Sequence, residues 1–268
     1  MRRAMLALAL LSASLSLAAH TPTSTDNATP DYKLALETSQ AVIGKPLGDY
    51  VLRDRLNREV RLGGYRGKPL LVSFIYTGCF EVCPITTRFL AKSVQAARAA
   101  LGPESFNVIT IGFNQPFDSP AAMAAFSRQN GISDPRWEFL SPDAGTLTAL
   151  TRDLGFTYYA TPKGFDHITQ LSVIDAQGVI YRQIYGDSYV LPMLVDPLKD
   201  LLSGQASRAV SVETIWTKVK LFCTVYDPNS GGYRVNYSLF VEIFTGLTVL
   251  GSIAWFLLRE RRRRSHVL

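Results

Sequence analysis

Strand-like and helix-like hydrophobic patterns alternate through the middle of the chain. Residues 69–76 (PLLVSFIY) form a continuous β-branched and aromatic run, which is typical of a strand buried on both faces. Residues 84–101 instead carry apolar side chains at helical spacing, and Pro84 suits the first turn of a helix. The same two patterns predict the remaining elements: strands over residues 106–113, 137–140, 169–175 and 178–185, and helices over residues 119–130, 143–154 and 191–202.

The order of these elements predicts the fold. Strands and helices alternate, and the series closes with an antiparallel hairpin and a last helix, so we expect an α/β sheet with helices on both faces. This is the order of a thioredoxin-like domain, which we place at residues 43–204. Two short alternating runs within residues 50–62 predict a hairpin extension at its N-terminal side. Residues 20–42, which include the polar stretch TPTSTDNATP, are predicted to be a linker.

The N-terminal residues 1–19 have the pattern of a secretory signal peptide. Arg2 and Arg3 precede an apolar run, and small residues stand near Ser16 and Ala18, where cleavage is expected. An uncleaved N-terminal membrane anchor is the alternative.

A second apolar segment lies near the C-terminus. Residues 237–258 contain one charge, Glu242, and as a helix would extend about 33 Å, the thickness of a bilayer core. Four arginines follow at residues 261–264, which favours a single transmembrane helix with a cytoplasmic tail over residues 259–268. Residues 205–236 would then be a juxtamembrane segment, and the domain would lie on the outer side. A buried core helix is the alternative.

The charge distribution argues against nucleic-acid binding. The net charge of +6 comes from Arg2, Arg3 and the last ten residues, and the rest of the chain is neutral. A neutral domain lacks the basic face that phosphate contacts require.

The candidate chemistry lies between the strand at 69–76 and the following helix. Cys79 and Cys83 are four positions apart at a helix start, where they can reach one another or share one ion, and where the helix dipole favours thiolate. A structural pair or a simple disulfide is the alternative. Three residues separate them, one more than in the C-x-x-C of thioredoxin-type enzymes, which leaves room for a metal. Thiolates select Cu(I), zinc or iron–sulfur clusters, so a third ligand is expected.

His167 is the candidate for that third ligand. It is the only histidine of the predicted domain, and it precedes a strand of the closing hairpin. In a thioredoxin-like fold this loop passes opposite the helix start that carries the thiols. Two cysteines and one histidine suit copper. The neighbouring Asp166 would orient the imidazole or be a solvated loop acid.

Three segments resemble the Sco/SenC family of copper-binding, thioredoxin-fold proteins: VSFIYTGCFEVCP (72–84), FDSP (117–120) and FDHITQLSVIDAQG (165–178). The resemblance implies copper ligation by Cys79, Cys83 and His167. It further implies copper delivery to, or thiol reduction of, the dinuclear copper centre of cytochrome c oxidase subunit II. The C-terminal anchor resembles a bacterial subgroup, and so implies the inner membrane with the domain in the periplasm.

The sequence departs from the family pattern at several positions. Phe80 and Glu81 stand where the family usually has Pro and Asp, and Asn114 replaces the first acid of the motif that ends in FDSP. Many relatives are anchored at the N-terminus instead.

Three functions are compatible with these residues. The first is a copper metallochaperone, and the second is a thiol–disulfide oxidoreductase that uses Cys79 and Cys83 on a copper-accepting partner. The third is a peroxidase of the peroxiredoxin type, for which Arg88 would have to activate the thiol. Cys223 is either a thiol available for an intermolecular disulfide or a small apolar residue. Tyr76 and Phe80 flank the thiols, where they would shield copper or simply pack.

Overall fold

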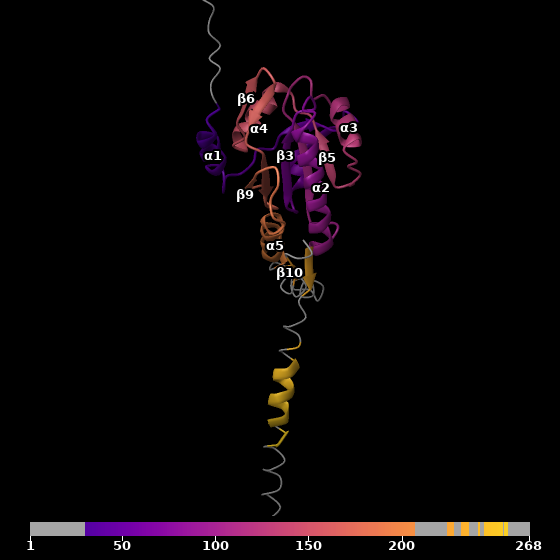
Figure 1. Cartoon of the computed structure of the whole chain (residues 1–268), viewed down its shortest axis with the longest axis vertical. Helices are drawn as coiled ribbons and strands as arrows, with labels where there is room; N and C mark the ends of the chain where they lie inside the picture. The colour runs from indigo at the N-terminus through magenta and orange to yellow at the C-terminus, as the bar shows by residue number, and fades with distance from the viewer. Residues whose placement is uncertain are drawn as a thin grey trace, which may run out of the picture.

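A five-stranded sheet forms the centre of the domain. The computed structural model describes residues 30–206, 224–227, 232–235, 241, 244–253 and 255–256. The strands stand in the order β5-β4-β3-β8-β9 (Figure 1). Their bounds are β3 (Leu70–Ile75), β4 (Asn107–Gly112), β5 (Trp137–Leu140), β8 (Gln170–Ile174) and β9 (Ile180–Tyr185). β3, β4 and β5 are parallel, whereas β8 is antiparallel to β3, and β9 to β8.

Helices pack on both faces of this sheet. Leu71 of β3 packs with residues of α2, α3 and α5, and Val72 packs on the opposite face with residues of α4, and both side chains are fully buried. The predicted strand buried on both faces and the thioredoxin-like α/β sheet are therefore confirmed. The helices are α2 (Val82–Leu101), α3 (Pro120–Gln129), α4 (Ala144–Asp153) and α5 (Pro192–Ala206).

The predicted N-terminal hairpin is present. β1 (Val51–Arg53) pairs antiparallel with β2 (Glu59–Arg61), and a short 3-10 helix η1 (Leu62–Tyr65) follows. The buried carboxylate of Asp54 accepts hydrogen bonds from two backbone N–H groups of the turn and from the Arg58 guanidinium. These bonds fix the turn, in which Leu56, the one apolar side chain, is exposed.

A helix stands where the sequence predicted a linker. α1 (Tyr32–Gln40) lies within residues 20–42 and packs beside the edge of the sheet (Figure 1). The Ser39 hydroxyl lies 2.7 Å from Gln170 Oε1 and 2.8 Å from the Tyr185 hydroxyl, and hydrogen-bonds to both. The linker prediction is therefore wrong for this stretch. α1 buries only Ala35 and Ser39, and the hydrogen bonds of Ser39 fix it, so no broad apolar stripe marks this helix in the sequence.

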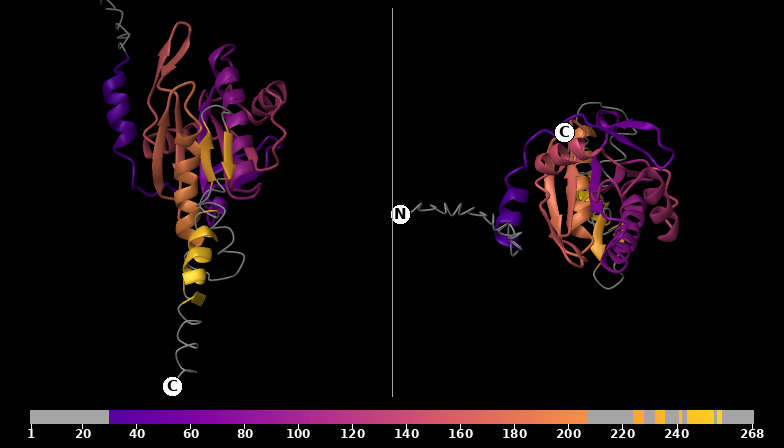
Figure 2. Two further views of the ribbon diagram at one scale, coloured as in Figure 1. Left: turned by 60° about the horizontal axis from the view of Figure 1, so that its bottom comes forward. Right: turned by 90° about the horizontal axis from the view of Figure 1, so that it is seen from above.

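A second hairpin was not predicted. β6 (Tyr158–Thr161) pairs antiparallel with β7 (Gly164–His167), and this two-stranded sheet shares no ladder with the central one. Figure 2 shows the hairpin projecting beyond the end of the central sheet. His167 is thus the last residue of a strand, paired with Tyr158, and not part of a free loop as predicted.

Near the C-terminus, β10 (Thr224–Asp227) pairs antiparallel with β11 (Gly232–Val235) inside the predicted juxtamembrane segment. Of residues 237–258, the structure describes 241, 244–253 and 255–256, and residues 244–253 are helical. Among the described residues, no helix combines the length and the hydropathy that a membrane span needs. The predicted signal peptide, the cytoplasmic tail and Cys223 lie outside the described residues.

The contact between α1 and the domain can be tested at Gly155. Its φ is +62°, and a Cβ there would lie 2.7 Å from the Ser39 Cα and 2.7 Å from the Thr38 carbonyl oxygen. Gly131 also follows a helix, with φ +69°, but a Cβ there would meet nothing within 4 Å. We expect Gly131→Ala to cost about 1–2 kcal/mol from backbone strain. Gly155→Ala should cost about 1–3 kcal/mol more from the clash. Urea unfolding measures both, and equal losses would contradict the packing of α1.

Candidate functional site

The two cysteines lie together where β3 ends and α2 begins. Cys79 is partly exposed in the connecting loop, and Cys83 is buried in the first helical turn, because α2 starts at Val82, two residues before the predicted Pro84. The Cys83 N–H donates a hydrogen bond of 3.2 Å to Cys79 Sγ. Both thiols are free. The first turn of a helix has N–H groups without helical partners, and here one of them is directed at sulfur.

The two thiols differ in acidity. Burial opposes ionisation of Cys79, but hydrogen bonds from the Cys83 N–H and thiol, the Glu81 backbone and the Tyr76 hydroxyl outweigh it, so the pKa of Cys79 lies below its usual value. Burial, together with the adjacent Cys79 sulfur, raises the pKa of Cys83 far above its usual value. The pair therefore combines a sulfur that ionises more readily than an ordinary cysteine with a partner that stays protonated at neutral pH.

Asp118 holds the thiol loop in place. Its buried carboxylate accepts hydrogen bonds from the Thr77 N–H and hydroxyl, both at 2.7 Å, and from the Asn114 N–H at 2.8 Å. Burial raises the pKa of Asp118, although these donors oppose the shift. The carboxylate thus ties the loop after β3 to the loop after β4. Asp118 is the acid of the FDSP motif (117–120), but the sequence alone did not indicate its role. The missing acid at Asn114 leaves this tie intact, because Asn114 contributes its backbone.

His167 lies in an aromatic cluster. Its ring is 5.4 Å from the Phe113 ring and 5.3 Å from the Phe156 ring, between centroids. Nδ1 lies 3.1 Å from the Ile168 carbonyl oxygen; since a carbonyl only accepts, Nδ1 carries the proton and Nε2 has the lone pair. Burial lowers the pKa of His167, so the ring is neutral at pH 7. A neutral imidazole with a free lone pair is the form that binds metals.

The structure brings the two sulfurs together but does not add His167 to them. Within the described residues, no group of three His, Cys, Asp or Glu side chains is close enough to hold a metal ion. Tyr76 lies between the thiol loop and the cluster around His167, with its ring 5.5 Å from that of Phe113. Two of the three predicted ligands, Cys79 and Cys83, therefore lie together, and His167 is held apart from them.

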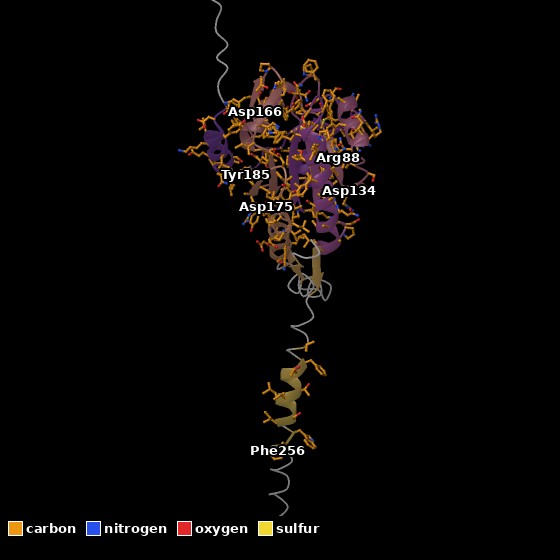
Figure 3. The ribbon with its side chains drawn as sticks, in the orientation of Figure 1. Arg88, Asp134, Asp166, Asp175, Tyr185 and Phe256 are labelled. Carbon is orange, nitrogen blue, oxygen red and sulfur yellow. The ribbon has the colours of Figure 1, made fainter. Side chains whose placement is uncertain are left out.

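The flanking residues take different positions. Phe80 is 92% exposed, so it neither packs nor covers the thiols, whereas Tyr76 is partly buried beside Cys79. Asp166 lies near α1, where it interacts with Tyr32 (Figure 3). The Nδ1 of His167 hydrogen-bonds to the Ile168 carbonyl oxygen and not to Asp166. Asp166 therefore does not orient the imidazole.

Arg88 gives no support to the peroxidase hypothesis. Its side chain is exposed on α2, five positions beyond Cys83 (Figure 3). The groups that lower the pKa of Cys79 belong to Cys83, Glu81 and Tyr76.

Comparison with known proteins gives a consistent set of relatives. A family model described as SCO1/SenC matches residues 39–199, more than half of the chain. The mitochondrial protein SCO2 homolog of Bos taurus is 28% identical over 181 residues, which make up 68% of this chain and 60% of that protein, so the match spans less than two thirds of its length.

Solved structures are similar over the same part of the chain. A proposed electron transfer protein from Aquifex aeolicus VF5 is 28% identical, with 59% of this chain and 92% of that chain covered and a TM-score of 0.53. ScoI of Bradyrhizobium japonicum, solved with copper bound, is 25% identical, with 59% and 99% covered and a TM-score of 0.49.

The asymmetry of the thiol pair can be measured by alkylation. In a Cys223→Ser background only Cys79 and Cys83 remain, and iodoacetamide at pH 7 should modify Cys79 at least about 10-fold faster, because thiolate is the reactive form. The midpoint of the Cys79 rate against pH should fall below the ordinary cysteine value of about 8.5. Mass spectrometry of the two peptides gives both rates. Equal rates, or a midpoint above the ordinary value, would contradict the hydrogen-bonded thiolate.

Proposed function

The chain belongs to the SCO1/SenC family, and from this premise we propose that it is a copper metallochaperone. It binds one copper ion through Cys79, Cys83 and His167, and it supports maturation of the copper centre of cytochrome c oxidase. The observation that carries the proposal is the 3.2 Å hydrogen bond between the Cys83 N–H and Cys79 Sγ, because it keeps two soft donors at one point of the helix start.

The donor chemistry supports copper. Thiolates favour soft metals such as Cu(I), zinc and iron–sulfur clusters, and imidazole binds copper as well, so the donor set fits copper, the metal that the family membership favours. Cys79 is already inclined to ionise, and a bound metal ion displaces the proton of Cys83 despite its raised pKa. The raised pKa makes metal binding by this pair depend on pH, with weaker binding as the pH falls.

The third ligand can approach the thiols without breaking the central sheet, although it would have to leave its contacts with Phe113 and Phe156. His167 ends β7, and the β6–β7 hairpin shares no ladder with the central sheet. A shift of this hairpin would break no hydrogen bond of the five-stranded sheet. In the described structure His167 lies in its aromatic cluster and not beside the thiols.

The same asymmetric pair favours a second function, thiol–disulfide oxidoreduction. The Cys79 thiolate would attack a disulfide of the copper-accepting partner and form a mixed disulfide, releasing one partner thiol. Cys83 would then attack Cys79 Sγ, which closes the Cys79–Cys83 disulfide and releases the second thiol. The partner gains two electrons and two protons, and this chain loses them. The low pKa of Cys79 and the buried, protonated Cys83 suit the attacking and resolving roles.

We further propose that the partner is cytochrome c oxidase subunit II or another copper-accepting protein. Two loops at this end of the sheet present apolar side chains to solvent: Phe80 of the thiol loop is 92% exposed, and Phe117 of the loop after β4, which Asp118 ties to it, is 72% exposed. Exposed apolar residues that gather around a reactive site favour contact with a protein over free diffusion of the ion.

A C-terminal anchor in the bacterial inner membrane, with the domain in the periplasm, completes the proposal. The helical residues 244–253 support it, because their apolar side chains have no cover: Phe244 is 73%, Leu247 66% and Leu250 65% exposed. The arginines at 261–264 would hold the tail in the cytoplasm.

Copper titration of the reduced protein tests the ligand set. The wild type should bind one copper with a thiolate-to-copper charge-transfer band. Cys79→Ser, Cys83→Ser and His167→Ala should each weaken binding by more than the roughly 10–100-fold that loss of a mere supporting partner costs. His20→Ala serves as the control, since this histidine lies far from the domain in sequence, and it should bind like the wild type.

The His167→Ala variant also separates the two functions. If the protein is a copper chaperone, the His167→Ala variant should fail to support oxidase assembly. If the protein is a thiol reductase, His167→Ala should still support assembly, whereas the Cys79→Ser and Cys83→Ser variants should fail. Full-stoichiometry, tight copper binding by His167→Ala would contradict the three-ligand proposal.

A further inference from the structure

Two short stretches join the β6–β7 hairpin to the rest of the domain. Leu154 and Gly155 precede the hairpin, after the end of α4, and Gln170 follows it as the first residue of β8. The two stretches are hydrogen-bonded to each other, because Gln170 Nε2 donates to the Leu154 carbonyl oxygen at 2.9 Å. The Gln183 side-chain amide of β9 donates to the same oxygen at 3.1 Å. We call Leu154–Gly155 and Gln170 the two roots of the hairpin.

Ser39 of α1 lies against both roots, and its side chain is buried. Its hydroxyl donates to Gln170 Oε1 at 2.7 Å. Since that bond uses the only hydroxyl proton of Ser39, the Tyr185 hydroxyl, 2.8 Å away, is the donor to Ser39 Oγ. At the other root, a Cβ at Gly155 would lie 2.7 Å from the Ser39 Cα, so only glycine lets α1 come this close. α1 therefore lies across the place where the hairpin leaves the domain and returns to it.

The roots adjoin the residues that surround His167. Phe156 follows Gly155 directly, and its ring lies 5.3 Å from the His167 ring and stacks on Phe74 of β3 at 4.1 Å, between centroids. Gln170 stands three positions after His167. Because the hairpin shares no ladder with the central sheet, the roots and the side-chain packing of the hairpin determine where His167 lies.

We infer that α1 is a strap that fixes the two roots, and that Ser39 is a positioning residue for His167. Four buried side chains build the contact, and each of their polar groups has a partner: Ser39, Gln170, Ser172 and Gln183. Without the Ser39 hydroxyl, the buried Gln170 amide oxygen loses its donor and the roots lose their tie to α1. The strap is a property of this fold alone, and its effect on copper rests on the proposed function.

Hydrogen exchange tests the strap without copper. In Ser39→Ala, the backbone amides of the β6–β7 hairpin should exchange about 10-fold faster, since loss of a buried hydrogen bond makes local opening of the hairpin easier. The amides of β3 and β4 should keep their rates, whereas a general loss of stability would raise those rates as well.

Ser127→Ala is the matched control for this experiment. It also removes a buried helix hydroxyl, which bonds to the Ala124 carbonyl oxygen and to Arg55, but it lies on α3, on the opposite face of the sheet from the hairpin. NMR of the full chain follows the amides in each variant. Unchanged hairpin exchange in Ser39→Ala, or an equal increase in β3 and β4, would overturn the strap.

The positioning of His167 is tested by chemical modification. Diethyl pyrocarbonate reacts with a neutral imidazole nitrogen, and it should modify His167 several-fold faster in Ser39→Ala than in the wild type or Ser127→Ala. His20 and His266 lie outside the domain in sequence and serve as internal references, whose rates should not change. Mass spectrometry of the three peptides gives the rates. Equal His167 rates in all three proteins would overturn the positioning role.

The effect on copper is tested by titration. A hairpin without its strap must be ordered when His167 binds the ion, so Ser39→Ala should bind copper several-fold more weakly than Ser127→Ala. The Cys79 alkylation rate should stay the same, because the N–H that bonds to Cys79 Sγ belongs to α2 and not to the roots. Equal copper affinities would overturn this effect. If the wild type binds no copper, the proposed function fails, while the exchange and modification rates still decide whether the strap exists.

Discussion

The first turn of α2 leaves backbone N–H groups without helical partners, and the one at Cys83 donates to Cys79 Sγ. This contact decides the character of the site. It brings the second sulfur to the first, because the donor and the second thiol belong to the same residue. It also stabilises negative charge on Cys79, while burial keeps Cys83 protonated. Metal binding and disulfide exchange both start from such a pair, which is why one geometry supports both proposed functions.

The contact depends on two supports outside the helix. The Asp118 carboxylate holds Thr77, and with it the loop that leads to Cys79, against the loop after β4. The parallel pairing of β3 and β4 brings these two loops to the same end of the sheet. Buried apolar side chains on both faces of β3 fix that end in turn. The thiol pair is therefore a consequence of the fold, whereas His167 is carried by a hairpin that packs on the core through side chains and shares no strand pairing with the central sheet.

Much of this arrangement could be predicted from the sequence. The uninterrupted apolar run of β3 and the helical period of α2 are strong signals, and they place Cys79 and Cys83 at a helix start. α1 could not be predicted, because it buries only Ala35 and Ser39 and its docking depends on the hydrogen bonds of Ser39. The β6–β7 hairpin was missed because Gly164 and its neighbours resemble a loop. The sequence identified His167 as a candidate, but its aromatic surroundings depend on Phe113 and Phe156, which lie in the segments after β4 and after α4.

The central claim is that copper draws His167 to the two sulfurs. X-ray absorption of the Cu(I)-loaded protein tests this most directly, because it counts sulfur and nitrogen donors at the metal. The account predicts two sulfur donors and one nitrogen donor in the wild type, and loss of the nitrogen in His167→Ala. Two sulfur donors without nitrogen in the wild type, or identical spectra for the two proteins, would contradict it.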